Sequence, residues 1–314
     1  MQRRRSWVIS ETKAGTITQC LGVASAFDTC PAQRIVDYLP RWKRLFKPPL
    51  FQASEPEPSL LVSCGMRSEK PAMAMKDAYC GRPLAVHLQR PKADGYDLAF
   101  VSRHDWLPEF DDLANYHQVV GVVHRINRED LGRRRSAARK RLAPDDDKIA
   151  AVFVGGSNGA YLYDEQALAS IRSAVHCLAD QGWKVLVSTS RRSSSQTLAE
   201  MLTLSSERVS VWDRLSENPY LDYLAAADAY LIAKDSVTMP CEALATGRPV
   251  YSLDLTHLAG KREMKFERFH DDLQRVLKLT RPFAGTLDAY DYVPLDETSR
   301  IVNIVDKELS ARGL

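Results

Sequence analysis

The chain has 314 residues, of which 45% are hydrophobic and 26% are charged, and its formal net charge is +3. A chain of this length can form two domains, each with a sizeable core, and the composition excludes a fibrous or a disordered protein. So small a net charge gives no reason to expect a nucleic-acid partner, and we expect none.

Six cysteines are scattered along the chain without any C-x-x-C pair. This spacing indicates neither a zinc site nor a disulfide framework, so we expect reduced thiols, a cytoplasmic protein and no bound metal ion. The arginine-rich start lacks an apolar run of signal-peptide length, and no stretch approaches the about 18 apolar residues of a membrane span. Any membrane contact is therefore expected to be peripheral, on the inner face.

Short apolar runs alternate with helical patterns through the first part of the chain. Strands are predicted at residues 7–10, 33–38, 60–63, 84–88, 97–101 and 118–122, and helices at residues 19–27 and in a segment that ends at Tyr79. This alternation predicts one parallel sheet covered by helices.

Two charged segments interrupt this pattern. Residues 41–47 read RWKRLFK, so that four cations alternate with Trp, Leu and Phe. This composition suits an anionic membrane surface and hence a lipid-linked acceptor, but an ordinary loop that covers its own core explains it equally well. Residues 128–147 are strongly charged; we interpret them as a solvated helix and interdomain linker, with phosphate binding as the alternative.

A second α/β set begins with an apolar strand at residues 149–154. Further strands are predicted at residues 185–189, 208–212 and 230–233 and from Pro249 onward, and helices from a cap at Asp164 to Gly182 and at residues 196–204, 218–227, 261–279 and 297–312, with a short one ending at Gly247. The predicted fold class is therefore α/β, with two Rossmann-like doubly wound domains that face each other across a cleft. We expect the domains at residues 1–140 and 141–285, and a helical segment at 286–314 that returns to the first domain.

The loops that follow the strands of the second set carry the predicted site, because ligands of parallel sheets bind beyond the carboxyl ends of the strands. After the first strand come Gly155, Gly156, Ser157 and Asn158. Paired glycines allow a backbone to approach a ligand, and amides entering a helix favour an anion such as a diphosphate. A simple tight turn remains the alternative.

Arg191 and Arg192 follow the next strand and offer two guanidiniums for a phosphate, unless they are ordinary surface charges. Asn218 and Tyr220 open the helix before the last loop, where capping by Asn218 explains most of the pattern.

The last loop is formed by Lys234, Asp235 and Ser236, with Glu242 on the short helix that follows. We assign the three loop residues to the diphosphate or sugar side, although Asp235 and Ser236 also suit a helix cap. Glu242 lies among small and apolar residues, and a carboxylate there can accept hydrogen bonds from two ribose hydroxyls, as acidic residues do in dinucleotide sites. An exposed, solvated glutamate is the alternative.

The order of these motifs resembles the mitochondrial-fission "elongated mitochondria" family over nearly the whole chain. The resemblance rests on GGSN, SRR and NPYLDYLAAADAYLIAKDSVTMPCEALATGRPV in the second half, and on SWVISETKAGTITQCLG, CGMRS, HLQRP and SRHDW in the first half. The family is similar in fold to the GT-B glycosyltransferases, so the resemblance implies a GT-B-like arrangement with a nucleotide-sugar as co-substrate and no other cofactor. It also implies that Glu242 holds the nucleotide ribose.

Two positions depart from the family pattern. Met66 and Arg67 stand where the family has two arginines, and Thr16 stands where the family has His or Asn. Thr16 cannot act as a general base near neutral pH, which weakens the case for catalysis by that loop.

Glycosyl transfer needs a base for the acceptor hydroxyl and positive charge for the departing diphosphate. Glu11, His104 and Asp105 are the candidate bases, on loops of the first domain. Arg191, Arg192, Lys234 and the amides of Gly155 and Gly156 can supply the electrostatic part without a metal.

Two functions of different classes remain. The first is a glycosyltransferase that moves a sugar from a nucleotide-sugar to an envelope glycolipid or lipopolysaccharide-type acceptor. The second is a non-catalytic GT-B-like adaptor or scaffold, since plant relatives in the family are associated with the recruitment of fission machinery.

Overall fold

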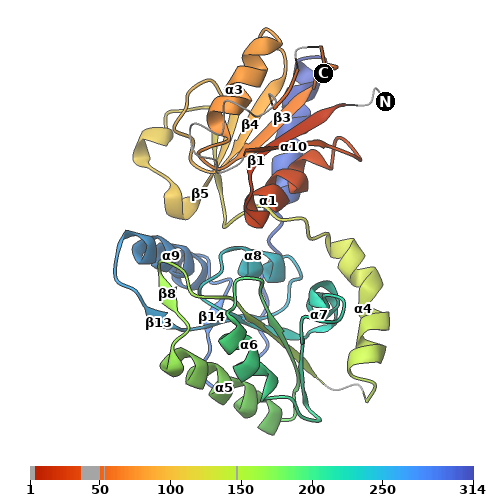
Figure 1. The fold of residues 1–314 in the computed structure, drawn as a ribbon, viewed down its shortest axis with the longest axis vertical. Helices are drawn as coiled ribbons and strands as arrows, with labels where there is room; N and C mark the ends of the chain where they lie inside the picture. Colours follow the sequence, from red (N-terminus) through yellow and green to blue (C-terminus); the bar gives the residue numbers. More distant parts are fainter. Residues whose placement is uncertain (1–3, 37–49, 53, 146–147) are drawn as a thin grey trace. The chain divides into compact units, whose positions relative to one another are not determined.

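The computed structural model describes residues 4–36, 50–52, 54–145 and 148–314. The chain forms two compact units, one from Met1–Arg125 with Asp296–Leu314 and one from Ile126–Leu295. Each unit contains a six-stranded sheet (Figure 1) whose strand pairs are all parallel. The predicted α/β class with two Rossmann-like domains is therefore confirmed. The basic and aromatic segment at 41–47 lies outside the described residues.

The sheet of the first unit has the strand order β2-β1-β3-β4-β5-β6. Its strands are β1 (Ser6–Glu11), β2 (Ala32–Val36), β3 (Leu60–Cys64), β4 (Leu84–Leu88), β5 (Leu98–Ser102) and β6 (Tyr116–Val119). Strands β3 and β4 are buried along their whole length, because helices cover both faces of a parallel sheet. Such strands read as continuous apolar runs, which is why the sequence predicts them well.

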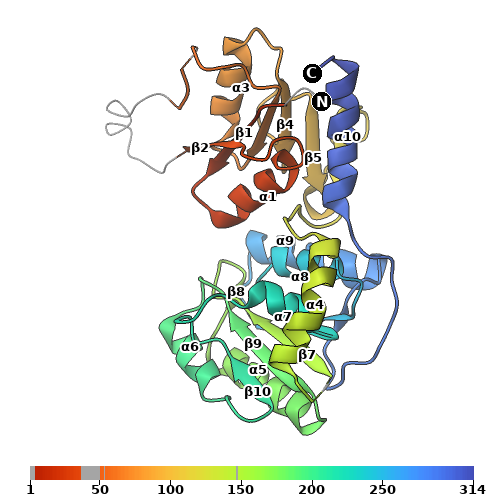
Figure 2. The same cartoon turned by 90° about the vertical axis from the view of Figure 1, so that its right-hand side faces the viewer.

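Helices cover both faces of this first sheet. They are α1 (Ala14–Ala24), α3 (Glu69–Ala78) and α10 (Glu297–Ala311), with short 3-10 turns at η1 (Arg103–Asp105) and η2 (Pro108–Phe110). Helices α1 and α10 pack on one face, where Ile301, Val305 and Leu309 join the core, and Figure 2 shows α10 along the sheet near β5. Helix α3 covers the other face, where its Ala72 and Met75 join Trp7 of β1 in a second buried cluster. The end of the chain thus completes the first unit.

The sheet of the second unit has the order β10-β9-β7-β11-β12-β14. Its strands are β7 (Ile149–Val154), β9 (Lys184–Thr189), β10 (Val209–Val211), β11 (Ala229–Ala233), β12 (Val250–Leu253) and β14 (Arg281–Pro282). A separate antiparallel pair is formed by β8 (Tyr161–Leu162) and β13 (Thr256–His257). The sequence does not predict β8, β13 and β14, since two residues show no periodicity.

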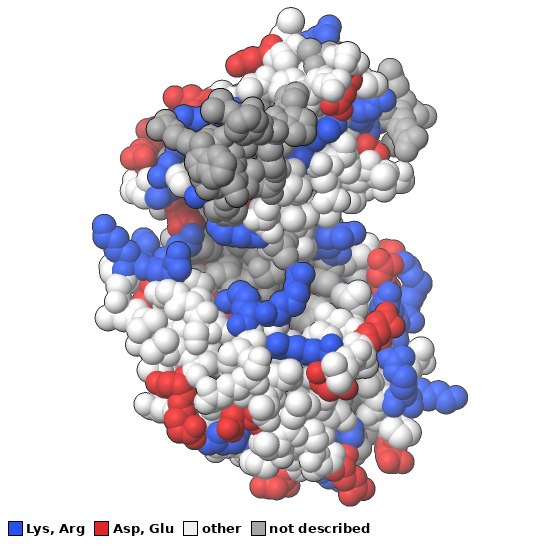
Figure 3. All heavy atoms as spheres, viewed as in Figure 1, with Lys and Arg blue, Asp and Glu red and all other residues white. Residues whose placement is uncertain are grey.

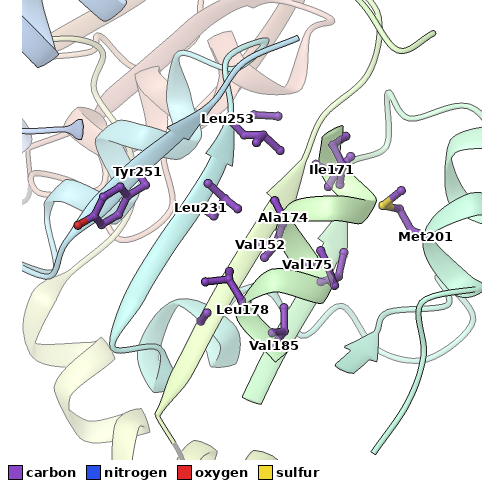
Figure 4. Close-up of a cluster of buried hydrophobic side chains, with 14 of the residues drawn as sticks. Val152, Ile171, Ala174, Val175, Leu178, Val185, Met201, Leu231, Tyr251 and Leu253 are labelled. Atoms are coloured by element: carbon purple, nitrogen blue, oxygen red, sulfur yellow. The ribbon is translucent and has the colours of Figure 1, made fainter. Parts of the chain in front are cut away.

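The helices of the second unit are α4 (Arg128–Leu142), α5 (Glu165–Asp180), α6 (Ser195–Leu202), α7 (Tyr220–Ala226), α8 (Thr238–Leu244) and α9 (Lys261–Asp271), with a π-helical turn at Asp272–Val276. Asp164 caps α5 as predicted, by accepting a hydrogen bond from the amide of Ala167. Figure 4 shows the core between α5 and the sheet, with Ile171, Val175 and Leu178 directed at the strands.

Helix α4 was expected to link the domains, and the structure joins it to the second unit. Its Arg135 donates hydrogen bonds to the carbonyl oxygens of Ala225, Ala226 and Ala227, which end α7. Arg135 and Arg139 also pair with Asp228, at 2.6 and 2.8 Å. The unit boundary therefore lies at Arg125 rather than near residue 140, and the chain returns to the first unit at Asp296 rather than at 286.

The outer side of α4 carries many charged side chains, as its sequence predicts. Figure 3 shows Lys and Arg side chains gathered on the right, where α4 lies in Figure 1. Several of them are paired: Arg133 contacts Asp130, and Arg141 lies 2.6 Å from Asp222. Within the described part of the chain, no helix has both the length and the hydropathy needed to cross a bilayer.

Candidate functional site

The strand order of the second unit defines where a ligand would bind. The chain runs from β7 outward through β9 to β10 and then crosses to β11 on the other side of β7. Beyond the carboxyl ends of β7 and β11 the connections diverge, and ligands of doubly wound sheets bind at such a switch point. Gly155 directly follows β7 and Lys234 directly follows β11, so two predicted loops flank this point.

The two glycines after β7 lie against other segments of the second unit. The amide of Gly155 donates to the hydroxyl of Tyr163 at 2.8 Å, and the amide of Gly156 donates to Asp235 Oδ2 at 3.1 Å. The expected anion cradle of these two amides is therefore not formed, because both amides already have protein acceptors. The close approach predicted from the paired glycines does occur, but its partners are Asp235 and the backbone of Arg192.

Ser157 and Asn158 stabilise the turn after the glycines. Ser157 Oγ accepts a hydrogen bond from the amide of Tyr163. Asn158 Oδ1 accepts from the amides of Ala160 and Tyr161, and its Nδ2 donates to the carbonyl oxygen of Asp235. The polar side chains of GGSN thus hold the loop to its neighbours, as the tight-turn alternative predicts.

The three residues after β11, Lys234, Asp235 and Ser236, have different roles. Ser236 caps the first turn of α8 by accepting from the amide of Met239 at 3.1 Å, whereas Asp235 is a buried acceptor for its neighbours. Lys234 is only 12% exposed at its side chain and pairs with Asp254 at 3.3 Å. Its ammonium group is therefore directed at a carboxylate in the loop that follows β12.

The arginine loop after β9 is held in place by a residue that the sequence did not single out. Arg214 donates to Thr189 Oγ1 and to the carbonyl oxygens of Ser190 and Ser193. Arg214 has a φ of +66°, in a region that non-glycine residues rarely adopt. This clamp fixes the segment that carries both predicted arginines.

Arg191 and Arg192 differ in their surroundings. Arg191 is exposed and lines a cavity, while Arg192 pairs with Asp235 at 2.7 Å and keeps 48% of its side chain exposed. Both guanidiniums thus lie at the carboxyl edge of the sheet, where phosphate binding was predicted. Arg192 is therefore not an isolated surface charge.

The cavity has a volume of about 160 Å³. Its apolar wall consists of Phe153, Trp212, Tyr220 and Met239, and its polar wall of Ser188, Thr189, Ser190, Arg191 and Asn218. An adjacent cavity of about 380 Å³ shares Trp212 and Asn218. Because ligand pockets usually measure about 300–1,000 Å³, the smaller cavity can hold only part of a nucleotide-sized ligand.

Asn218 and Tyr220 have a structural and a cavity-lining role. Asn218 Oδ1 accepts from the amide of Tyr220 at 3.0 Å, which is the capping contact expected at the start of α7. The ring of Tyr220 packs on Phe153, with ring centres 4.7 Å apart. Both residues line the smaller cavity, so capping does not exclude a role in binding.

Glu242 is neither exposed nor without a partner. It is 9% exposed, and Tyr220 donates its hydroxyl to Glu242 Oε2 at 2.5 Å. The solvated-glutamate alternative is therefore wrong. Met239, one helical turn earlier on α8, lines the smaller cavity, so Glu242 lies behind the wall formed by Tyr220 and Met239 in this structure.

The candidate bases of the first unit are not brought together. Glu11 is the last residue of β1, whereas His104 and Asp105 lie in the turn after β5. Strands β3 and β4 lie between β1 and β5. Three inter-strand spacings of about 4.8 Å therefore place β5 about 14 Å from β1. These residues therefore cannot act as one catalytic group within the first unit.

Glu11 has the more distinctive position of the three. In the first sheet the connections that follow β1 and β3 run in opposite directions, and Glu11 ends β1 at that switch point. Its side chain is buried, accepts from the amide of Arg67 at 3.2 Å and pairs with Lys13 at 2.9 Å. His104 is also buried, with its Nε2 3.9 Å from Asp105. Asp105 is 20% exposed at its side chain.

Three residues of the site were missed from the sequence. They are Tyr163, Arg214 and Trp212, which come from the turn after β8 and the loop after β10. An aromatic or an arginine in a loop carries no spacing signal, so only the fold brings them to the site. Across the described ranges, no group of three or more His, Cys, Asp or Glu is arranged to hold a metal ion.

The buried Glu242 predicts a measurable pH dependence. Burial raises the pKa of Glu242 from 4.5 to about 7, although the hydrogen bond from Tyr220 opposes the rise. Because the folded pKa lies above the unfolded one, the stabilisation is complete below the unfolded pKa and is lost as the pH rises through the folded pKa. We expect wild type to lose about 3 kcal/mol of unfolding free energy relative to Glu242→Gln between about pH 4.5 and pH 8.

Denaturant unfolding of both proteins across this pH range measures the difference, and the glutamine variant cancels the contribution of all other groups. Parallel stability curves for the two proteins would contradict the prediction.

The fold resembles that of several solved structures, among them a UDP-GlcNAc 2-epimerase and a glycotransferase. The UDP-GlcNAc 2-epimerase from Methanocaldococcus jannaschii, in complex with UDP-GlcNAc and UDP, aligns with a TM-score of 0.53 at 12% identity, over 96% of this chain and 99% of that one. The MnaA-UDP structure from S. aureus aligns with a TM-score of 0.51 at 14% identity, over 98% and 97%. The glycotransferase of kitacinnamycin gives 0.51 at 14% identity, over 99% and 94%. These likenesses establish a GT-B-like fold.

Sequence comparison identifies the family. The mitochondrial fission protein ELM1 of Arabidopsis thaliana is 24% identical in an alignment of 283 residues that covers 82% of this chain and 65% of that protein. An uncharacterized protein of Rickettsia prowazekii (strain Madrid E) is 24% identical in an alignment of 237 residues that covers 72% of this chain and 64% of that protein. The chain thus spans slightly less than two thirds of these relatives. The family model described as Mitochondrial fission ELM1 matches residues 14–309, and the chain therefore belongs to this family.

Proposed function

We propose that this chain is a GT-B-type glycosyltransferase that moves a sugar from a nucleotide-sugar to an envelope glycolipid or lipopolysaccharide-type acceptor. One observation carries the proposal: the 155–158 loop, the 190–193 loop and the Tyr220–Glu242 pair surround one switch point of the second sheet. Ligands of doubly wound sheets bind at this position. The MnaA structure from S. aureus, which shares the fold, was solved with UDP.

The described residues of the second unit suit the parts of a nucleotide-sugar. Aromatic rings of Trp212 and Tyr220 offer flat apolar surface for a base. The exposed guanidiniums of Arg191 and Arg192 complement a diphosphate, and they would stabilise its charge as it leaves without requiring a metal. Glu242 would accept from the ribose hydroxyls once Tyr220 moves aside.

The acceptor is assigned to the first unit. Glu11 is the favoured base among the three candidates, because it lies at the switch point of its own sheet, where a ligand would bind. His104 and Asp105 remain the alternatives. A lipid-linked acceptor would bring a cytoplasmic protein to the inner face of the membrane, and the basic segment at 41–47 is the part of the chain whose composition favours such contact.

A non-catalytic adaptor is the second candidate. The hydrogen bonds inside the second unit favour it, because the amides of Gly155 and Gly156 and the carboxylate of Glu242 all have partners within the protein. A pocket with these polar groups satisfied is stable without a ligand. The Arabidopsis relative carries the name of a mitochondrial fission protein, which is the kind of role that an adaptor would have.

Thermal unfolding with a panel of UDP-, CMP-, GDP- and ADP-sugars tests the two candidates. A sugar nucleotide that binds should stabilise the protein by about 2.7 kcal/mol at a concentration one hundred times its dissociation constant. Glu242→Gln should weaken that binding, while Glu165→Gln, an exposed glutamate on α5, should not. Stabilisation by none of the panel would reject the transferase and favour the adaptor. Equal binding by wild type and Glu242→Gln would reject the ribose role.

A further inference from the structure

The carboxylate of Asp235 is the shared acceptor of several hydrogen bonds at the switch point of the second sheet. The residue is 1% exposed, and none of its side-chain surface reaches solvent. Its position after β11 predicted a contact with the diphosphate or the sugar, yet a group buried to this extent cannot touch a ligand without rearrangement. The role of Asp235 therefore has to be sought in the groups that surround it.

Three donors from three segments meet at this carboxylate. Tyr163 donates its hydroxyl to Oδ1 at 2.6 Å, the amide of Gly156 donates to Oδ2 at 3.1 Å, and Arg192 Nη2 lies 2.7 Å from Oδ2. A buried charge is stable only when it is paired and hydrogen-bonded in this way. Asp235 thus joins the loops after β7 and β9 and the turn after β8 to the end of β11.

The close packing around Asp235 explains why a glycine is needed at position 155. A Cβ at Gly155 would lie 1.9 Å from Asp235 Oδ2, closer than any side chain allows. The carboxylate therefore sits directly against the backbone of the glycine loop. Arg192, with 48% of its side chain exposed, is the most exposed member of this cluster.

Arg192 is well suited to bind an anion. Its Nη2 is fixed by Asp235, its Nη1 donates to the carbonyl oxygen of Gly156 at 3.4 Å, and its side chain is 48% exposed. A guanidinium has five N–H donors, so donors remain available at the exposed edge. Fixing a long side chain in advance lowers the entropy cost of binding a phosphate.

We propose that Asp235 and Tyr163 are positioning residues that hold the guanidinium of Arg192 for the phosphates of a nucleoside diphosphate group. The inference rests on the proposed function, since it refines how the same site recognises its ligand. In this arrangement Asp235 acts through Arg192 and does not contact the ligand. The sequence assignment of Asp235 to the ligand side is thereby replaced by an indirect role.

The ratio of two affinities tests this role. Calorimetry measures the affinity of the full chain for UDP, ADP, GDP and CDP and for the matching nucleosides, which lack the phosphates. For the preferred base, we expect Asp235→Asn and Arg192→Gln each to reduce the diphosphate-to-nucleoside affinity ratio by about tenfold or more, with nucleoside affinity unchanged. Tyr163→Phe should reduce the ratio by a smaller factor, and Arg192→Lys should restore part of it.

A double variant separates positioning from general damage. If Asp235 acts through Arg192, then Asp235→Asn in the Arg192→Gln background should not lower the ratio further. Asp271→Asn removes another Asp–Arg pair of the same unit, between the last residue of α9 and Arg275 in the π-helical turn that follows. Both side chains are exposed, so this variant should leave the ratio unchanged. If Asp235→Asn fails to fold, Arg192→Gln and Tyr163→Phe decide the question, because the first lies half exposed and the second leaves the ion pair intact.

Two failures can be told apart. If wild type binds neither nucleoside diphosphates nor nucleosides, the proposed function is rejected together with this inference. If wild type favours the diphosphate and the ratio stays within twofold in Asp235→Asn or in Arg192→Gln, only the positioning role is rejected. A further loss in the double variant would also overturn it, because Asp235 would then act independently of Arg192.

Discussion

Replacing Gly156 with alanine is expected to lower the free energy of unfolding by about 3 kcal/mol or more. A Cβ at this position would lie 2.2 Å from the carbonyl oxygen of Arg192 and 2.8 Å from the amide nitrogen of Ser193. Both are backbone atoms in a loop that Arg214 clamps, so no rotamer change can relieve the overlap.

Gly132→Ala provides the matched control for this substitution. Gly132 lies inside α4, and a Cβ there would meet nothing within 4 Å. Alanine is favoured over glycine in a helix by up to about 1 kcal/mol, so this variant should be slightly more stable than wild type. Denaturant unfolding of the three proteins gives the comparison. If the two variants were equally stable, the tight packing at Gly156 would be disproved.

Loss of the Arg135 side chain is expected to destabilise the protein by about 3 kcal/mol. The guanidinium ends α7 by donating to the carbonyl oxygens of Ala225, Ala226 and Ala227, at 2.9, 3.0 and 2.9 Å. Arg135→Ala would remove these charge-assisted hydrogen bonds, each of which contributes about 1 kcal/mol or more. It would also remove one of the two arginine partners of Asp228, which Arg139 continues to pair.

Arg133→Ala on the same helix is the control. Arg133 is 68% exposed and pairs with Asp130 on the surface, where an ion pair contributes about 0–1 kcal/mol. Helix propensity changes equally in both variants, so the difference between them isolates the contacts with α7. A difference below about 1 kcal/mol would mean that α4 is not held to α7 through Arg135. Chemical denaturation monitored by circular dichroism measures both values.

The fold was largely predictable because its central strands are buried on both faces. Strand β7 spans residues 149–154 and β4 spans 84–88, as the apolar runs predict. Such runs carry a strong local signal. Strands β8, β13 and β14 contain two residues each, and their pairing depends on distant segments, so no local pattern announces them.

The unit boundaries were less predictable for a different reason. The sequence of α4 indicates a charged, solvated helix, and its exposed side agrees with that interpretation. The carbonyl groups that receive Arg135 lie about ninety residues further along the chain. Only packing on α7 reveals that the helix belongs to the second unit.

The loops of the candidate site were identified correctly as neighbours, since parallel strands bring their carboxyl ends to one edge. Their partners were not identified. Tyr163 reaches the glycine loop from the turn after β8, and Arg214 reaches the arginine loop with a positive φ. Neither contact could be predicted from the sequence, because no motif with a recognisable spacing links the two residues that it joins.

The stretch from Lys234 to Glu242 shows most clearly which features follow from the local sequence and which follow from the tertiary structure. By itself, the sequence determined the strand, the turn and the short helix, because apolar runs and a capping serine act locally. Tertiary structure alone decided that Asp235 is buried against Gly155 and holds Arg192, and that Glu242 is covered by Tyr220. The physical reason is that burial and pairing depend on which distant groups the sheet brings within hydrogen-bond distance.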